Sequence, residues 1–377
     1  MHTSDQKIFN ILHVISRLPV GGAENMLLKE VKGYHKDRFR ASVCCLKEGG
    51  KIADELQRSG YNVEILNTMK GHGFDFKAVT AIYKLIKREN IHILRTHQYH
   101  ANLYGRIGGI LAGVPVIIST SHNLYAFPDS PKLHRRIINY LLGFFTDALV
   151  AVSNAVASDM MRYDKVKPEK VRVIYNGILM DEFSKDITKQ EARKILNLPS
   201  HVLIIGTVGN LTEQKGHKFL IEAASELKDT CIAIAGDGPL KDELKDFANR
   251  IGVNCIFMGR IDPEIISVFL RALDIFCFPS LWEGFGVALL EAMASGLPIV
   301  ASDILPHREV VVDDVILVSP GNSGKLAEAL NALIKDPSLR MNLGQKAQEK
   351  ARIFSIENTV KSYEDIFIEL LSKKNLL

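Results

Sequence analysis

The chain has 377 residues; 47% of its side chains are hydrophobic, and 47 Lys and Arg against 43 Asp and Glu give a formal net charge of +4. At roughly 100–200 residues per domain, this length predicts two domains of moderate size. The hydrophobic content excludes a disordered chain, and the lack of a fixed repeat or biased tract excludes collagen, coiled-coil and low-complexity proteins.

Neither a membrane span nor a signal peptide is predicted. The longest charge-free apolar stretch, residues 107–121, is shorter than the roughly 20 apolar residues that a span needs. The first seven residues lead directly into a strand-like segment, without the charged and apolar regions of a signal peptide. The five cysteines include no Cys-x-x-Cys pair and fit buried thiols in a reducing compartment. We therefore expect a cytoplasmic protein.

Charge is unevenly distributed along the chain. Residues 1–180 carry 25 Lys and Arg against 15 Asp and Glu, whereas the remaining residues carry 22 against 28. A basic first half favours anionic partners such as phosphates, acidic glycans or a lipid surface. Nucleic acid is not an expected partner, because no known binding motif is present and the basic residues are scattered.

In the first half, apolar runs of strand length alternate with amphipathic stretches of helix length. Strands are predicted at 8–15, 41–46, 61–66, 91–96, 114–120, 148–152 and 171–174, and helices at 23–34, 52–59, 76–88, 101–111 and 132–144. Continuous Val/Ile/Leu strands separated by helices are typical of a parallel sheet covered on both faces.

The alternation starts again after residues 180–200, a charged stretch without a strong strand signal that we interpret as the domain junction. Strands are predicted at 202–208, 231–235, 255–258, 275–278 and 299–301, with helices ending at 227 and 250. Two consecutive α/β sheets would face each other across a cleft, and ligands of such sheets bind at the carboxyl ends of the strands.

The strongest chemical signal lies within residues 278–298. A strand is predicted to end near Phe278, and a helix to start near Gly286 after a glycine-containing loop. Glu283 lies in this loop and Glu291 in the second turn of the helix. Loop glycines permit close backbone approach, and the free N–H groups of a helix start attract a phosphate. A carboxylate can accept hydrogen bonds from two sugar hydroxyls at once.

This segment resembles the motif of two glutamates separated by seven residues in retaining glycosyltransferases of the GT-B fold. With its flanking residues it looks like glycosyltransferase family 4, and further segments resemble family landmarks in the expected order: 19–24, 119–123, 152–154, 175–178, 209–216, 236–239 and 257–260. The resemblance implies an α/β GT-B fold of two Rossmann-like parallel-sheet domains facing across a cleft. Residues 1–183 would bind the acceptor, residues 184–355 the nucleotide-sugar donor, and the C-terminal helix 356–377 would cross back to the first domain.

The resemblance also implies a role for each matching residue of the second domain. Glu291 would hold the ribose hydroxyls of the nucleotide, and Glu283 would contact hydroxyls of the donor sugar. Lys215 would neutralise the diphosphate, whose charge grows as the glycosidic bond breaks. Three backbone N–H groups would face the sugar or the diphosphate: those of Phe285, Gly286 and Val287.

In the first domain, Gly22 would let its loop approach the phosphates, and His122 would lie beside the donor sugar. Arg260 would lie near the base. One position departs from the family: Asn210 stands where an arginine is usual, and a neutral amide cannot form a bidentate charged contact. Either Arg260 or Arg17 substitutes for it, or the leaving group is less stabilised. The family's usual glycine before the last strand is also absent, which leaves the donor and the turnover rate open.

The implied reaction is sugar transfer, with retention of configuration, from a nucleotide-diphosphate sugar to a hydroxyl of a glycan or lipid-linked acceptor. A UDP-sugar is the expected donor, and surface polysaccharide biosynthesis the expected pathway. Because Asp-x-Asp occurs nowhere in the chain, neither a metal nor another cofactor is expected. Two alternatives stay open: a sugar-nucleotide epimerase on a similar fold, and a non-catalytic sugar-nucleotide binder.

Simpler interpretations of the same residues also stay open. Glu283 and Glu291 could be surface carboxylates, Lys215 a solvated loop lysine, and His122 a structural histidine. His97 and His100 lie three positions apart, but the sequence offers no further metal ligands beside them.

Residues 132–145 combine a basic start with many apolar side chains. They predict either a core helix with a solvated first turn, or a basic amphipathic surface that contacts anionic lipid on the inner face of the cell membrane.

Overall fold

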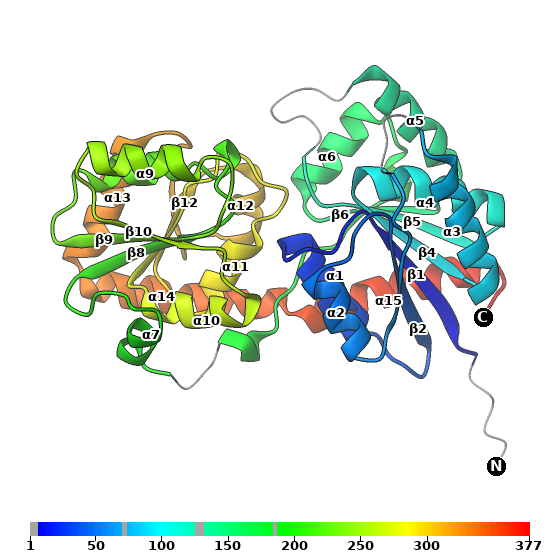
Figure 1. Cartoon of the computed structure of the whole chain (residues 1–377), viewed down its shortest axis with the longest axis horizontal. Coiled ribbons are helices and arrows are strands. Elements are labelled where there is room, and N and C mark those ends of the chain that lie inside the picture. The colour runs from blue at the N-terminus through cyan, green and yellow to red at the C-terminus, as the bar shows by residue number, and fades with distance from the viewer. Residues whose placement is uncertain (1–6, 70–73, 125–131, 184–186) are drawn as a thin grey trace, which may run out of the picture. The chain divides into compact units, whose positions relative to one another are not determined.

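The structure is a computed structural model that describes residues 7–69, 74–124, 132–183 and 187–377. The chain forms two compact units, one comprising Met1–Gly177 with Ile356–Leu377 and the other comprising Ile178–Ser355 (Figure 1). Each unit contains one parallel sheet, which confirms the predicted α/β class with two Rossmann-like domains.

The division between the units differs by six residues from the sequence-based boundary after residue 183. The short 3-10 helix η2 (Met180–Phe183) contacts α10 (Pro263–Ala272) and α11 (Val287–Ala294). Residues 178–183 are therefore part of the second unit.

The sheet of the first unit has the strand order β3-β2-β1-β4-β5-β6-β7. The order reverses between β1 and β4, which makes these strands the topological switch point of the sheet. The strands are β1 (Phe9–Ile15), β2 (Phe39–Cys45), β3 (Asn62–Ile65), β4 (Ile93–His97), β5 (Val116–Ser121), β6 (Ala148–Ala151) and β7 (Val171–Val173).

Helices flank this sheet (Figure 1). On one face, α3 and α4 pack over β1 and β4 around a buried core that includes Leu12, Ile82 and Leu94. The helices are α1 (Gly22–Gly33), α2 (Lys51–Arg58), α3 (Phe76–Glu89), α4 (Gln98–Ala112), α5 (Leu133–Phe144), α6 (Asn154–Tyr163), η1 (Pro168–Lys170) and α15 (Ile356–Lys373).

The C-terminal helix α15, red in Figure 1, packs on the first unit beside α1. The ring centroid of Phe367 lies 5.6 Å from that of Tyr34 and 5.5 Å from that of Phe39. The guanidinium of Arg95 lies 3.5 Å from the ring centroid of Tyr363. Because both aromatic side chains of α15 are fully buried, this helix contributes directly to the core of the first unit.

The sheet of the second unit has the order β10-β9-β8-β11-β12-β13, and its switch point lies between β8 and β11. Its strands are β8 (Leu203–Val208), β9 (Thr230–Ala235), β10 (Cys255–Gly259), β11 (Ile275–Phe278), β12 (Ile299–Ser302) and β13 (Ile316–Val318). Its remaining helices are α7 (Lys189–Ile195), η3 (Glu213–Lys215), α8 (His217–Ala224), α9 (Lys241–Arg250), α12 (Leu305–Val310), α13 (Ser323–Lys335), α14 (Pro337–Ala351) and η4 (Arg352–Phe354).

The described part of the chain contains no long apolar helix and no disulfide. No helix within it has the length and apolar character that crossing a membrane requires. All five cysteines are free thiols.

Candidate functional site

Three loops at the carboxyl ends of β8, β9 and β11 are joined by backbone hydrogen bonds. The N–H of Leu211 donates to the carbonyl of Asp237 at 3.0 Å, and the N–H of Leu281 donates to the carbonyl of Gln214 at 2.7 Å. Because β8 and β11 flank the switch point, their loops stand where α/β sheets bind ligands.

Two glycines allow these loops to approach one another. Gly216 has φ +63°, and a Cβ atom there would lie 2.1 Å from the carbonyl oxygen of Pro279. Gly286 has φ +97°, and a Cβ atom there would lie 3.2 Å from the ring of Phe278. Glycine adopts such backbone angles without the steric cost that a side chain imposes. Gly286 therefore lets the start of α11 lie close to the rings of Phe278 and His307.

An ion pair joins the loop after β8 to the loop after β11. The Lys215 Nζ lies 2.5 Å from the Glu283 Oε1, and the side chain of Glu283 is only 6% exposed. Ser280 Oγ donates to the same oxygen at 2.8 Å, and Gln214 Nε2 donates to the other carboxylate oxygen at 3.4 Å. A buried carboxylate needs such compensation for its lost hydration. The structure thus brings together two predicted site residues that are 68 positions apart.

His307 borders this pair, although the sequence analysis did not propose it as a site residue. Its Nδ1 lies 2.7 Å from the carbonyl oxygen of Ser302. A carbonyl can only accept, so Nδ1 carries the proton, and in the neutral ring Nε2 is an acceptor. Burial lowers the pKa of His307, which keeps the ring neutral. Nε2 is buried, has no hydrogen-bond partner among the described residues, and lies 3.4 Å from the position of a Cβ atom on Gly286.

The other predicted residues of the second unit lie on the same loops or next to them. Phe285 and Gly286 are buried in the turn before α11, while Val287 and Glu291 are partly buried within this helix. Their assigned roles stay predictions.

Asn210 and Arg260 are both exposed: Asn210 lies in the loop after β8, and Arg260 directly follows β10. The pKa of Asp237 is lowered by the N–H of Gly238 and by Lys241, with a smaller contribution from the charge of Arg260. Arg260 thus acts electrostatically on the loop after β9. The other candidate cation, Arg17, pairs with Glu48 at 3.1 Å in the first unit.

In the first unit, His122 stands at the end of a row of three histidines. His13 Nδ1 lies 3.1 Å from His97 Nε2, and His97 Nδ1 lies 3.2 Å from His122 Nε2. Neighbouring rings stack, with centroids 5.4 and 5.5 Å apart. His122 Nδ1 is buried and has no hydrogen-bond partner within the described residues. The row crosses the switch point from β1 through β4 to the residue after β5, and it fixes the orientation of the His122 ring.

The buried guanidinium of Arg95 acts electrostatically on these histidines. Arg95 Nη1 donates to Glu30 at 2.6 Å and to the Tyr34 hydroxyl at 2.8 Å. Burial and, second, the charge of Arg95 lower the pKa of His13 and His97 well below the ordinary value and that of His122 to about 4. The histidines are therefore neutral at pH 7.

These histidines predict that the protein loses stability in mild acid. An imidazole with a lowered folded-state pKa binds protons more readily in the unfolded chain, so its full contribution is present above about pH 6.5 and declines below that pH. Below that pH, each buried histidine should lower the free energy of unfolding by about 1 kcal/mol for each pH unit. Urea unfolding between pH 7.5 and 5.5 should give falling midpoints. His97→Gln should weaken this dependence, whereas replacing the exposed His134 by Gln should not; equal midpoints across this range would contradict the argument.

Gly22, the remaining predicted site residue, begins α1 directly after the loop that follows β1. The loop is anchored through Glu24, which accepts a hydrogen bond from Gln98 Nε2 at 2.8 Å. Gln98 begins α4 directly after β4, so this bond joins the first turns of α1 and α4 at the switch point of the first sheet. The predicted contact of Gly22 with phosphates stays a prediction.

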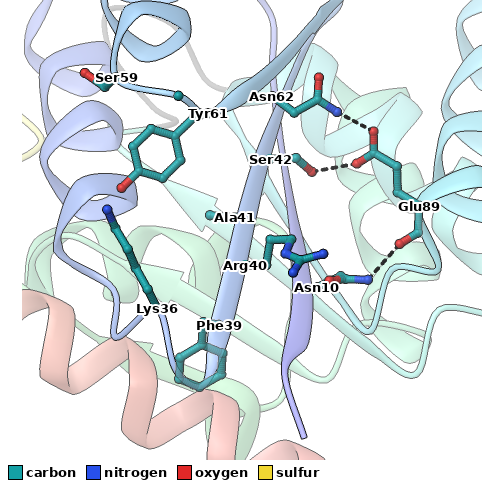
Figure 2. A pocket seen from close by; sticks show the side chains of 11 residues that line it. Asn10, Lys36, Phe39, Arg40, Ala41, Ser42, Ser59, Tyr61, Asn62 and Glu89 are labelled. Carbon is teal, nitrogen blue, oxygen red and sulfur yellow. Dashed lines mark hydrogen bonds between the residues drawn. The ribbon is translucent and has the colours of Figure 1, made fainter.

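A pocket of about 500 Å³ lies at the opposite, amino end of the first sheet (Figure 2). Its carboxylate, Glu89, accepts hydrogen bonds from Ser42 at 2.9 Å and Asn62 at 2.6 Å, and its main-chain carbonyl accepts one from Asn10 at 2.8 Å. These bonds join the end of α3 to β1, β2 and β3. Since ligands of such sheets bind at the carboxyl ends of the strands, this pocket is not part of the candidate site.

No group of three or more His, Cys, Asp and Glu side chains in the described part of the chain is arranged to hold a metal ion. The expected absence of a metal requirement stays a prediction.

Two family models match the chain, one in its first half and one in its second half. Residues 20–182 match the model "Glycosyltransferase Family 4" and residues 188–350 match "Glycosyl transferases group 1". A similar curated protein is the UDP-Gal:α-D-GlcNAc-diphosphoundecaprenol α-1,3-galactosyltransferase of Escherichia coli. The two sequences are 29% identical over an alignment of 394 positions, which covers 99% of this chain and 100% of that protein.

Further relatives and solved structures resemble the chain. The D-inositol 3-phosphate glycosyltransferase of Corynebacterium glutamicum is 27% identical over 74% of this chain and 72% of its own length. The crystal structure of Anabaena HepE in complex with UDP and glucose has a TM-score of 0.86 and 22% identity, covering 96% of this chain and 100% of that one. The matched models, the two parallel sheets and the ordered motifs together establish that this chain belongs to glycosyltransferase family 4, with the GT-B fold.

Proposed function

We propose that this protein transfers a sugar from a UDP-sugar to a hydroxyl of a lipid-linked or glycan acceptor, with retention of anomeric configuration. The ion pair between Lys215 and Glu283 carries the proposal, because it sets a cation and a carboxylate at the switch point beside the start of α11. The names of the similar proteins, which include UDP and a diphosphoundecaprenol acceptor, support the choice of donor and acceptor.

On this proposal the second unit holds the donor. Glu291 binds the ribose hydroxyls, and the N–H groups of Phe285, Gly286 and Val287 face the sugar or the diphosphate. Lys215 exchanges its contact with Glu283 for the diphosphate, which leaves the Glu283 carboxylate to accept from sugar hydroxyls. Such an exchange keeps each buried charge compensated in the free and the bound protein.

The chemical step then needs placement and charge stabilisation more than a strong base. The acceptor hydroxyl attacks the anomeric carbon from the face that the diphosphate leaves. Its proton passes to a leaving phosphate oxygen as the bond between the sugar and the phosphate breaks. Lys215 stabilises the negative charge that grows on the diphosphate. His122, neutral at its position, accepts from or donates to the donor sugar through Nδ1.

His307 is proposed as a second imidazole that contacts the donor sugar. Its buried Nε2 is an acceptor beside the start of α11, so a sugar hydroxyl is a suitable donor to it. We expect His307→Phe to raise KM for the sugar nucleotide by about 5- to 150-fold, the cost of an unpaired polar group, with little change in UDP affinity. Donors lacking single hydroxyls test this directly. The donor that lacks the hydroxyl contacted by His307 should have the same KM with the wild-type protein and with His307→Phe. An equal rise of KM for every donor would contradict the assignment.

We propose that no metal ion takes part, because Lys215 and backbone N–H groups supply the positive potential that the diphosphate needs. Transfer should be unchanged after dialysis against EDTA. A loss of activity that Mg²⁺ or Mn²⁺ restores would contradict this.

The acceptor side of the proposal is a lipid-linked saccharide used in surface polysaccharide biosynthesis. The first unit would bind it, with Gly22 and His122 on its loops. We further propose a cytoplasmic protein in peripheral contact with the inner face of the cell membrane. The excess of Lys and Arg in residues 1–180 supports contact with an anionic surface.

The test combines UDP-galactose, chosen from the similar Escherichia coli protein, with a synthetic N-acetylglucosaminyl diphosphate lipid. A product with an α-linked galactose, identified by NMR, supports retaining transfer. Consumption of the donor without an acceptor, giving an epimer, would favour an epimerase. Binding of UDP without turnover of any sugar nucleotide would favour a non-catalytic binder, for which the neutral Asn210 is the supporting observation.

A further inference from the structure

Helix α5 packs on the first unit through polar side chains. Asn139 is its buried residue. The Asn139 Oδ1 accepts from Arg106 Nη2 at 2.7 Å, and its Nδ2 donates to Asp164 Oδ2 at 3.0 Å. Arg106 and Asp164 are themselves buried. A buried network of this kind fixes which face of the helix turns inward, since each of its members would lose hydrogen bonds if the helix rotated.

The two arginines of α5 also contact side chains or backbone of neighbouring helices, although Arg135 stays exposed. The Arg135 guanidinium lies 4.3 Å from the ring centroid of Tyr99 on α4. Arg136 Nε donates to the carbonyl of Tyr163 on α6 at 3.0 Å. The first turn is solvated as predicted, since residues 132–135 are exposed. The prediction of a core helix is wrong, because the buried side chain of α5 is polar and its large apolar side chains are exposed.

The outward face of α5 is apolar. Its exposed side chains follow the spacing of one helix face, and they are between 45% and 67% exposed. We call this set the α5 stripe: Leu133, Ile137, Tyr140, Leu141, Phe144 and the adjacent Phe145. α5 lies at the periphery of the first unit, next to α6 (Figure 1). A contiguous set of six large apolar side chains in water marks an interaction surface.

Positive charge accompanies the stripe at both ends. Residues 132–146 include two exposed cations, Lys132 and Arg135, and no Asp or Glu. At the other end, Lys170 Nζ donates to the carbonyls of Gly143 and Phe144 at 2.9 and 3.1 Å. This contact holds the segment 165–170, with the exposed Lys165, against the end of α5.

We propose that the α5 stripe docks this protein on an anionic phospholipid bilayer, with Leu and aromatic side chains in the interface and the flanking cations at the headgroups. An apolar face with flanking Lys, Arg and aromatic residues is what an interfacial helix uses, and anionic lipids attract its cations. A second copy of the chain fits less well, because pairing two such faces brings like charges together. The inference rests on the proposed function for its setting, since a lipid-linked acceptor lies in such a bilayer.

The test is co-sedimentation with vesicles of phosphatidylglycerol and phosphatidylcholine, compared with phosphatidylcholine alone. The wild-type protein should bind the anionic vesicles at least about tenfold more strongly. Ile137→Glu/Leu141→Glu should lower that binding at least about tenfold. The matched control is Leu111→Glu, a leucine of α4 that is similarly exposed, and it should bind as the wild type does. Arg135 and Arg136 are left intact, because they pack on tyrosines.

Charge and folding are controlled separately. Lys132→Glu/Lys165→Glu should weaken binding to anionic vesicles and leave the unfolding temperature unchanged. Equal binding to both vesicle types, or no effect of the double Glu variant of the stripe, would overturn the inference. So would a wild-type dimer in sedimentation velocity that Leu141→Glu converts to a monomer. UDP binding is measured on the same samples. A protein that binds UDP but no vesicles would contradict only the docking proposal. A protein that binds vesicles but no UDP would contradict only the proposed donor site.

Discussion

Lys215→Met should lower kcat for sugar transfer by about 10²- to 10³-fold, the range observed when one group that stabilises developing charge is removed. The Lys215 Nζ is the cation that the structure sets against Glu283 at the switch point of the second sheet. Steady-state rates with UDP-galactose and the synthetic acceptor measure the effect. The matched control is Lys218→Met, because Lys218 is an exposed lysine three residues later in the chain, in α8. This variant should retain wild-type activity.

Lys215→Met also affects stability, because the substitution leaves the Glu283 carboxylate buried without its cation. In similar cases this costs several kcal/mol of the free energy of unfolding. Lys215→Met/Glu283→Gln removes both charges and should restore the stability of the second unit but not the activity. Glu283→Gln alone should also be nearly inactive, because an amide cannot accept from two sugar hydroxyls with both of its polar atoms. Wild-type turnover by either single variant would contradict the proposed roles.

Removal of residues 356–377 should abolish folding of the first unit. Helix α15 buries Ile356, Val360, Tyr363, Ile366, Phe367, Leu370 and Leu371. At about 1.5–3 kcal/mol for each buried side chain, their loss costs roughly 10–21 kcal/mol, which is comparable with or larger than the roughly 5–15 kcal/mol that stabilises a typical domain. Circular dichroism and hydrogen exchange of the truncated chain measure this. Protection that persists in β1 and β4 would contradict it.

A point substitution tests the same packing in a chain that still folds. Phe367→Ala should lower the free energy of unfolding by about 3–5 kcal/mol, as for other buried phenylalanines. Phe76→Ala, at a phenylalanine that is 76% exposed, should change it by less than about 0.5 kcal/mol. Equal effects of the two substitutions would mean that α15 adds little to the core.

The central strands of both sheets could be predicted from sequence because they are buried on both faces. The edge strand β13 (Ile316–Val318) is only partly buried, and it was not predicted. The run 275–278 was predicted with the same ends as β11, since Ile, Phe, Cys and Phe are all buried there. Helix starts were less predictable. The first helical residue of α4 is Gln98 rather than residue 101, and Gln98 has φ +66°. Its bond to Glu24, 74 positions away, is a tertiary contact that no local pattern reveals.

The orientation of α5 could not be predicted for a related reason. Amphipathic spacing predicts that apolar residues face inward, yet the hydrogen bonds of Asn139 with Arg106 and Asp164 turn the polar face inward. The partners come from α4 and from the residue after α6, so the network exists only once these elements have assembled.

Part of the candidate site could be predicted and part could not. Glu283 and Lys215 lie in recognisable motifs. Their ion pair, which joins residues 68 positions apart, could not be predicted because it forms only in the folded protein. His13 had a signal that was overlooked: a histidine within the apolar strand 8–15 must be buried, and a buried imidazole needs a partner. His307 had no such signal, because its acceptor nitrogen is defined by the bond of Nδ1 to Ser302.

We propose that the loops after β8 and β11, together with α11, form a UDP site in the second unit. The most direct measurement is thermal unfolding with and without UDP, on the wild-type protein and on Glu291→Ala. At one hundred times its dissociation constant, UDP should stabilise the wild-type protein by about 2.7 kcal/mol, and this gain should be lost in the variant. No stabilisation by UDP, or equal stabilisation of both proteins, would contradict the assignment of the donor site.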